Sequence, residues 1–163
     1  MTAEEKIPPE ITSEQFKQLY LVSKVIHSTL DQQEALDLII REAVRLVNAT
    51  TGSLVLINPI NGFLEIQAAY SLPEESKLKL RVGEGITGWV AQQGKSAIVR
   101  NVHKDERYVQ VHKHTKSELA VPLEINGLLS GVVNVDSDKF NAFNQNDLAL
   151  LTELTSQAAL VIH

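Results

Sequence analysis

The most informative absence from this sequence is cysteine, of which the 163 residues contain none. Without a thiol, the chain cannot form a disulfide, a cysteine-ligated zinc site, an iron–sulfur cluster or a thioether link to a chromophore. A thiolate nucleophile is excluded for the same reason. The classes of function that depend on sulfur chemistry are therefore closed to this chain.

Long apolar runs are also absent: none approaches the roughly 18 to 20 residues that a membrane-spanning helix needs. Residues 1–11 are polar, include Pro8 and Pro9, and have no apolar core of the kind that a secretory signal carries. We therefore expect a disordered leader over residues 1–11, a cytoplasmic protein and no membrane partner. The net charge is −5, with basic residues scattered apart from a loose group between Arg107 and Lys116, which disfavours direct binding of nucleic acid.

Periodic apolar residues predict helices at both ends of the chain. Apolar side chains recur every three or four residues there, and Asp31 and Asn144 stand where N-cap residues are expected. A short apolar stretch bounded by glycines in the middle of the chain suits two helical turns. The expected helices span residues 12–30, 31–48, 86–93 and 144–162.

An alternating pattern predicts strands between these helices, over residues 53–58, 63–70, 96–99, 117–125 and 128–137. Asn61-Gly62 and Asn126-Gly127 suit tight hairpin turns, because asparagine and glycine tolerate positive φ. Strands joined mainly by tight turns imply an antiparallel sheet, so the fold class is α+β, with helices on one face of the sheet. Long polar loops over residues 71–79 and 101–116 are left to cover the other face, where a pocket is expected.

Strand parity assigns individual side chains to these two faces. Successive side chains point to opposite faces of a sheet. The apolar positions that share the helix-packed face are Leu119, Val121, Leu123, Val133 and Val135. The opposite parity brings Glu118, Ala120, Asn134 and Asp136 together on the loop-covered face.

Four stretches, in this order and at these spacings, resemble the GAF domain family. They are VGEGITGWVA (82–91), SELAVPL (117–123), GVVNVDS (131–137), and Phe143 with Asp147 at the start of the last helix. The resemblance covers roughly residues 31–162. It implies an antiparallel sheet of about six strands, a ligand pocket on one side and dimerisation through the terminal helices. We expect a single GAF domain over residues 12–163, with a dimerisation or linker helix (12–30) and a GAF core (31–162).

The three polar pocket positions resemble the acidic ligand-holding positions of the free methionine-(R)-sulfoxide reductases, a catalytic branch of the family. That branch works by cysteine attack on the sulfoxide, so a chain without cysteine is expected not to be an enzyme and to have no catalytic residues. Two carboxylates and an amide could still bind an amino group, a purine edge or a cation. The alternative is that Glu118 and Asp136 cap turns and pair with arginine or lysine.

Other residues carry weaker hypotheses. Trp89, the only tryptophan, is a core residue or a lid over the pocket, and Tyr108 is a ligand contact or part of a solvated loop. Gly83 to Gly88 matches a dinucleotide-binding glycine pattern, but an antiparallel sheet and a short following helix favour a simple turn. The histidines of the long loop, His103, His112 and His114, have no third ligand at a diagnostic spacing, so no metal site is predicted.

Together these features predict a non-catalytic sensory or regulatory GAF domain from a bacterial signalling or transcription-regulatory protein, in which ligand binding is relayed through the terminal helices of a homodimer. The predicted ligand-binding residues are Glu118, Asn134, Asp136, Trp89, Tyr108 and Ala120. The ligand and any cofactor are not identified by the sequence. The alternative function is a ligand-free dimerisation or relay domain, and a cavity of roughly 300 Å³ or more would favour the sensor.

Overall fold

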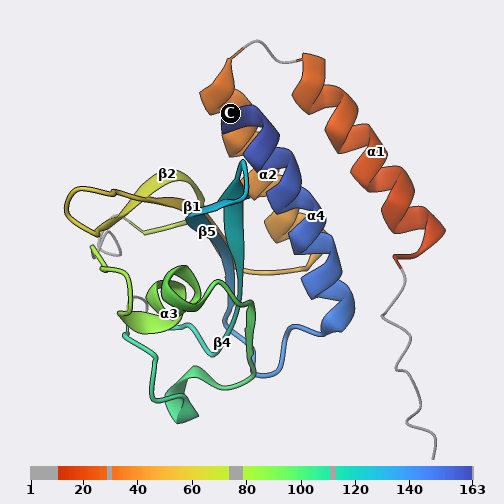
Figure 1. Ribbon diagram of the computed structural model, residues 1–163. Coiled ribbons are helices and arrows are strands. Elements are labelled where there is room, and N and C mark those ends of the chain that lie inside the picture. Colours follow the sequence, from red (N-terminus) through yellow and green to blue (C-terminus); the bar gives the residue numbers. More distant parts are fainter. Residues whose placement is uncertain (1–10, 29–30, 74–78, 111–112, 163) are drawn as a thin grey trace, which may run out of the picture.

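The computed structural model describes residues 11–28, 31–73, 79–110 and 113–162, which form an antiparallel sheet with helices on both sides (Figure 1). The helices are α1 (Ser13–Ser28), α2 (Gln32–Leu46), α3 (Gly85–Gln93) and α4 (Gln145–Ile162), with a 3-10 turn, η2, at Val102–Lys104. The strands are β1 (Thr51–Ile57), β2 (Leu64–Tyr70), β3 (Ala97–Val99), β4 (Ser117–Ile125) and β5 (Leu128–Ser137).

Within these described residues the sheet has five strands, in the order β2-β1-β5-β4-β3, and every neighbouring pair is antiparallel. The predicted α+β class is therefore confirmed. The count is one below the six or so strands that the family resemblance implied. Only an isolated bridge between Phe63 and Arg81 extends the pairing beyond β2.

The two faces of the sheet have different coverings. Helices α2 and α4 lie on one face, and α1 packs outside them, whereas α3 lies on the opposite face (Figure 1). The predicted parity is confirmed: Leu119, Val121, Leu123, Val133 and Val135 belong to the large core beneath the helices. A smaller apolar cluster, which includes Ala120 and Val132, lies on the other face under α3.

Local hydrogen bonds explain where the elements begin. Asp31 accepts a hydrogen bond from the backbone N–H of Gln33 at the start of α2. At α4, the side chain of Asn144 accepts from the Asp147 N–H and that of Asp147 accepts from the Asn144 N–H, which is the reciprocal pattern of a capping box. These contacts satisfy backbone donors that a helix leaves unpaired at its N-terminus.

Both strands of the β4–β5 hairpin have the predicted bounds. The two residues of its turn, Asn126 and Gly127, have the positive φ that a tight hairpin turn needs. The expected loop 101–116 contains the short η2 turn, which the sequence did not predict. The proposed leader, the end of the first helix at 29–30 and part of the 71–79 loop lie outside the described residues.

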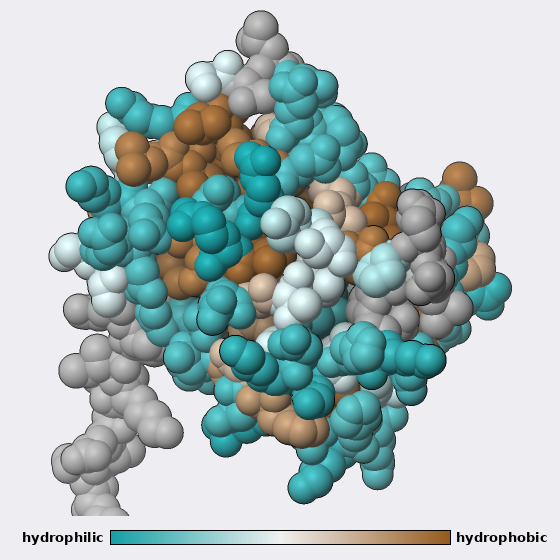
Figure 2. All heavy atoms as spheres, turned by 180° about the vertical axis from the view of Figure 1, so that it is seen from behind, coloured by the Kyte–Doolittle hydropathy of each residue, from teal (hydrophilic) through white to brown (hydrophobic). Residues whose placement is uncertain are grey.

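Helix α1 is attached by a narrow apolar contact. Only Val22 and Ile26 among its residues are buried, while Phe16, Tyr20, Leu21 and Val25 are each at least half exposed. Seen from behind (Figure 2), apolar surface lies among hydrophilic side chains on the side of the molecule that carries the terminal helices. No helix in the described ranges is both long and apolar enough to cross a bilayer.

Leu119 and Leu128 provide a test of this two-faced packing within a single hairpin. Leu119 is fully buried beneath the helices, and Leu128 is 71% exposed beside the turn. We expect Leu119→Ala to lower the free energy of unfolding by about 2–5 kcal/mol because it leaves a cavity. Leu128→Ala should change it by less than about 0.5 kcal/mol. Urea denaturation followed by circular dichroism measures both values, and similar losses for the two variants would contradict the assigned faces.

Candidate functional site

A cavity of about 70 Å³ lies on the α3 side of the sheet. Its apolar lining consists of Val55, Leu64, Ile66, Leu72, Leu80, Ile86 and Val109. Its polar lining consists of Ser53, Thr87, Tyr108, Thr115, Glu118, Asn134 and Asp136. The lining of the cavity therefore combines an apolar part with a polar part that includes two acids and an amide.

The two acids come from adjacent strands and face each other. Glu118 on β4 is the antiparallel partner of Asp136 on β5, so the two side chains project from the same face of the sheet at neighbouring positions. They are only 6% and 7% exposed. The predicted meeting of Glu118, Asn134 and Asp136 on the loop-covered face is confirmed.

Among the described residues, the side chains that donate hydrogen bonds to Glu118 are neutral. The Thr87 hydroxyl donates to Glu118 Oε1 at 3.3 Å, and Asn134 Nδ2 donates to the same oxygen at 3.5 Å. No described residue hydrogen-bonds Glu118 Oε2, and no described arginine, lysine or histidine forms a salt bridge with this carboxyl group. The alternative interpretation of Glu118, as the partner of a basic side chain, does not hold within this part of the chain.

Strand β1 supplies a second polar row that orders the first. Ser53 donates its hydroxyl hydrogen to Asn134 Oδ1 at 2.5 Å, which directs the amide nitrogen of Asn134 toward Glu118. Thr51 donates to Asp136 Oδ2 at 3.5 Å. Asn134 and Asp136 are thus held by hydroxyl groups from the neighbouring strand β1, whereas the hydroxyl group bonded to Glu118 comes from α3.

Burial controls the protonation of both acids. Burial raises the pKa of Glu118 well above its usual range, the neighbouring Asp136 charge raises it further, and the Thr87 hydrogen bond opposes the shift. Burial also raises the pKa of Asp136, to about 7, against hydrogen bonds from Thr51 and Asn134. Two carboxyl groups this close in a low dielectric resist ionising together. The site can therefore hold protons near neutral pH or exchange them for a cation.

Glycines allow the chain to turn tightly into α3, the helix that carries Thr87. Gly85 has φ of +68° at the start of the helix. A Cβ on Gly88 would lie 2.5 Å from the backbone oxygen of Arg81, so a side chain there could not be accommodated without a shift of the backbone. The glycine pattern thus serves a tight turn and the close packing of α3 against residues 81–83, in agreement with the turn that the sequence favoured over a dinucleotide site.

Not every predicted ligand-binding residue reaches the cavity. Glu118, Asn134, Asp136 and Tyr108 line it, whereas Trp89 and Ala120 do not. The guanidinium carbon of Arg107 lies 4.3 Å from the centre of the Trp89 ring, and Ala120 is fully buried in the apolar cluster under α3. Parity placed Ala120 on the correct face but could not show that Val90 and its neighbours cover that position.

The sequence analysis missed the hydroxyl groups of the site. Thr51 and Ser53 have the same alternation on β1 as the acids have on β4 and β5, so strand parity could have identified them. Thr87 and Thr115 had no such signal, because their positions depend on the path of the loops and on the approach of α3.

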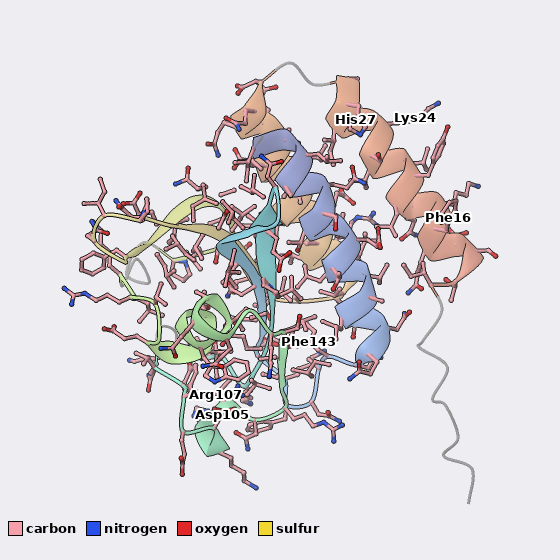
Figure 3. The ribbon with its side chains drawn as sticks, viewed as in Figure 1. Phe16, Lys24, His27, Asp105, Arg107 and Phe143 are labelled. Atoms are coloured by element: carbon pink, nitrogen blue, oxygen red, sulfur yellow. The ribbon has the colours of Figure 1, made fainter. Side chains whose placement is uncertain are left out.

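The other sequence hypotheses have structural explanations. Phe143 is buried in the main core (Figure 3) and Asp147 caps α4. His103 packs edge-on against Tyr108 and Phe140. Among the residues that the structure describes, no three His, Asp or Glu side chains are grouped as a metal site would require, and His112 lies outside them.

Comparison with known proteins identifies the family. Residues 29–163 match the family model described as GAF domain, so the chain belongs to the GAF domain family. It is similar to GAF domain-containing protein A of Dictyostelium discoideum (38% identity over 76 residues, 47% of this chain and 48% of that protein). It is also similar to the Nif-specific regulatory protein of Azospirillum lipoferum (28% identity, 72% of this chain). The chain spans about half of the first protein and 20% of the second.

Solved structures show the same fold. The GAF domain of an Acinetobacter phosphoenolpyruvate-protein phosphotransferase superimposes with a TM-score of 0.83 at 23% identity, covering 93% of this chain and 94% of that one. The free methionine-R-sulfoxide reductase of Neisseria meningitidis, solved with its substrate, gives a TM-score of 0.82 at 18% identity, covering 93% and 92%.

These reductases correct the expectation that the chain is not an enzyme. Enzymes with this fold occur among both the solved structures and the sequence relatives, which include the Escherichia coli reductase at 25% identity over 52% of each chain. Membership of the family therefore does not exclude catalysis. The missing cysteine bears on thiol chemistry alone, and the earlier expectation extended it too far.

The raised pKa of Asp136 predicts a specific dependence of stability on pH. In the folded protein this pKa is about 7, above the roughly 3.9 of an unfolded aspartate. The folded state therefore binds the proton more tightly, and its stabilisation is full below about pH 4 and is lost as the pH rises to about 7. We expect Asp136→Asn to gain stability relative to wild type over this interval, by roughly a few kcal/mol at pH 8.

Urea denaturation at several pH values from 4.5 to 8 measures this gain. The exposed Glu153 of α4 provides the matched control, because Glu153→Gln should leave the pH dependence unchanged. A difference between Asp136→Asn and wild type that stays constant with pH would contradict the assignment.

Proposed function

We propose that this GAF domain is a sensory module of a bacterial signalling or transcription-regulatory protein, that its cavity binds a small amine-bearing cation, and that the terminal helices of a homodimer relay the binding. The buried pair of Glu118 and Asp136, with Glu118 Oε2 left without a described partner, is the observation that carries the proposal. Regulatory relatives, such as the Nif-specific regulatory protein, support the assignment to a sensory class.

The charge balance of the cavity favours a cation over a neutral ligand. A buried carboxylate without a counter-ion is costly, and the cost falls when a cation replaces the lost water. An ammonium group offers three donors and no acceptor, which suits a wall that carries carboxylate oxygens. The apolar wall around Ile86 and Leu64 would contact a short hydrocarbon part of the same molecule.

The cavity volume limits the size of this ligand. At about 70 Å³ it is well below the 300–1,000 Å³ that is usual for sites of drug-like molecules. A short alkylammonium ion fits this limit best, and a larger ligand would need the loop that carries Tyr108 and Val109 to move. The small volume also supports a second candidate, a relay domain that binds no ligand.

Neighbouring residues of β1 face the cavity and the helices in turn, which supports the proposal that ligand binding is relayed to the helices. On β1, Thr51 and Ser53 contact the acid-bearing residues, while Gly52 between them faces α2. A Cβ on Gly52 would come within 2.7 Å of Val44 on α2. Because interiors this closely packed transmit displacement, a shift of β1 toward a ligand would also shift α2.

The test is a thermal-shift and calorimetric screen of linear alkylammonium ions from methyl to butyl, each paired with its neutral alcohol. We expect the ammonium ions alone to raise the melting temperature. Glu118→Gln should weaken their binding by about 10- to 100-fold, the loss of a hydrogen bond to a charged group. The exposed Glu65 of β2 serves as the matched control as Glu65→Gln.

The alternatives give different results in the same screen. Equal shifts with ammonium ions and alcohols would exclude the acid pair as the binding group. A protein indifferent to both series, and to purines and anions added as further probes, would favour the relay domain. Native mass spectrometry of the purified protein adds a search for a ligand already bound.

The proposed dimer uses the exposed apolar side of α1. Phe16, Tyr20, Leu21 and Val25 lie there at spacings of four and five residues, and Leu160 near the end of α4 is 63% exposed. Phe16 points away from α2 and α4 in Figure 3. A groove of about 220 Å³ between α1 and α2 is lined by Leu21, Val22, Val25 and Leu38. Apolar surface of this kind on terminal helices favours burial against a second copy.

Substitutions on α1 test this dimer directly. We expect the double variant Leu21→Glu/Val25→Glu to sediment as a monomer while the wild type sediments as a dimer, because four charges would be buried in a symmetric interface. Ile60, which is 93% exposed in the β1–β2 turn, provides the control as Ile60→Glu. A wild-type monomer at high micromolar concentration would refute the proposed interface.

A further inference from the structure

Arg107 has two partners outside the cavity. Its Nε donates to Asp105 Oδ1 at 2.9 Å and its terminal nitrogen donates to Asp105 Oδ2 at 2.7 Å, so the carboxylate binds the guanidinium group through both oxygens. The flat face of the group stacks on Trp89 at 4.3 Å. Figure 3 shows Arg107 and Asp105 together beside α3. We call these three residues the Arg107 latch.

The latch lies beside the acid pair. Trp89 and Tyr108 pack against the apolar cluster that contains Ala120, and Ala120 lies two residues from Glu118 on the same face of β4. Arg107 directly precedes Tyr108, which lines the cavity together with Glu118. Both charges of the latched pair act on Glu118: the Asp105 charge raises the pKa of that carboxyl group, and the Arg107 charge lowers it by less.

Glu118 would be a strong competitor for Arg107. Its Oε2 has no described hydrogen-bond partner, and its two described bonds, at 3.3 and 3.5 Å, are long. A guanidinium group pairs with carboxylates through two parallel bonds, and it does so more strongly away from water. The Asp105 pair is partly open to solvent, with side-chain exposures of 32% for Arg107 and 18% for Asp105, so solvent screens it more than it would screen a pair formed with Glu118, which is 6% exposed.

We propose that Asp105 and Trp89 together hold Arg107 out of the cavity, so that Glu118 stays available to a cation, and that release of the latch makes Arg107 an internal competitor for this carboxyl group. This inference rests on the proposed function only in naming an external cation as the ligand. The arrangement makes Arg107 a specificity-determining residue. While Arg107 is bound to Asp105 and Trp89, the cavity can bind a cation; once released, Arg107 would itself neutralise the carboxylate that binds it.

The pKa of Glu118 reports the position of Arg107 without any ligand. It can be measured by NMR titration of side-chain carboxyl carbons in the wild type, Asp105→Asn, Arg107→Gln and the double variant. The charged groups that act on Glu118 in the described structure are Asp136 from β5, and Asp105 and Arg107 from the loop. Asp105→Asn lowers the Glu118 pKa through its own lost charge, so the four proteins are needed to separate that effect from a movement of Arg107.

We expect Asp105→Asn to lower the Glu118 pKa by at least about one unit more in the wild type than in the Arg107→Gln background. Trp89→Leu, which changes no charge, should also lower it when Arg107 is present and leave it unchanged when Arg107 is replaced. Acrylamide should quench the fluorescence of Trp89, the only tryptophan, more strongly in Asp105→Asn and in Arg107→Gln than in the wild type, because the ring becomes more accessible.

A matched control exists on α2, where Glu42 binds both Nε and a terminal nitrogen of Arg45. Glu42→Gln removes a similar ion pair outside the cavity and should alter neither the Glu118 pKa nor Trp89 quenching. Equal effects of Asp105→Asn in both Arg107 backgrounds would show that Arg107 stays where it is, and would overturn the latch. Urea denaturation of each variant confirms that it is folded at the titration pH.

Butylammonium binding to the same variants completes the test. Asp105→Asn should weaken it at least tenfold, and the added Arg107→Gln should restore it. Failure of butylammonium to bind the wild type would overturn the amine proposal while the ligand-free titration still decides the latch. Binding that Asp105→Asn weakens and Arg107→Gln fails to restore would overturn the competitor role of Arg107.

Discussion

The alternation of side chains along the β4–β5 hairpin is the constraint on which the rest of the structure depends. Leu119 and Val135 pack beneath the helices, while Glu118 and Asp136, one position away on the same strands, face the cavity. A shift of either strand by one residue would exchange these sets and bury carboxyl groups among leucines. The turn at Asn126 and Gly127, where both residues have positive φ, sets the pairing next to it, and a register shift between Leu123 and Glu124 then brings Glu118 opposite Asp136.

This arrangement explains how the fold tolerates two buried acids. Desolvation of Glu118 and Asp136 opposes folding whenever they are ionised. The same two strands contribute fully buried apolar residues to the main core, whose burial stabilises the fold at the positions in between. The hydroxyl groups of Thr87 and Thr51, which donate to Glu118 and Asp136, reduce the cost further. The cavity is thus a locally unfavourable site on strands that the opposite face stabilises.

The sequence predicted most of the fold because local signals agreed with the tertiary packing. Both strands of the long hairpin have the predicted bounds, and the caps at Asp31 and Asn144 lie where expected. The polar centre of the site followed from strand parity alone. What failed depends on loop path and volume: the sequence could not show that Trp89 stacks on Arg107, that Thr87 reaches Glu118, or that the cavity is only about 70 Å³.

On strands β1 and β4, residues that face the cavity alternate with residues that face the helices. A displacement at the cavity would therefore have to pass through only one residue to reach the core. Gly52 touches α2 while its neighbours touch the polar row, and Glu118 adjoins Leu119, which belongs to the core beneath α2 and α4. Helix α1 lies at the end of this path, with only Val22 and Ile26 buried. Since α1 is the least firmly packed of the helices on that face, a small displacement of α2 or α4 would be taken up there before it disturbed the sheet. The weak attachment of α1 therefore suits a role in which a structural change at the cavity would be passed on to whatever α1 contacts.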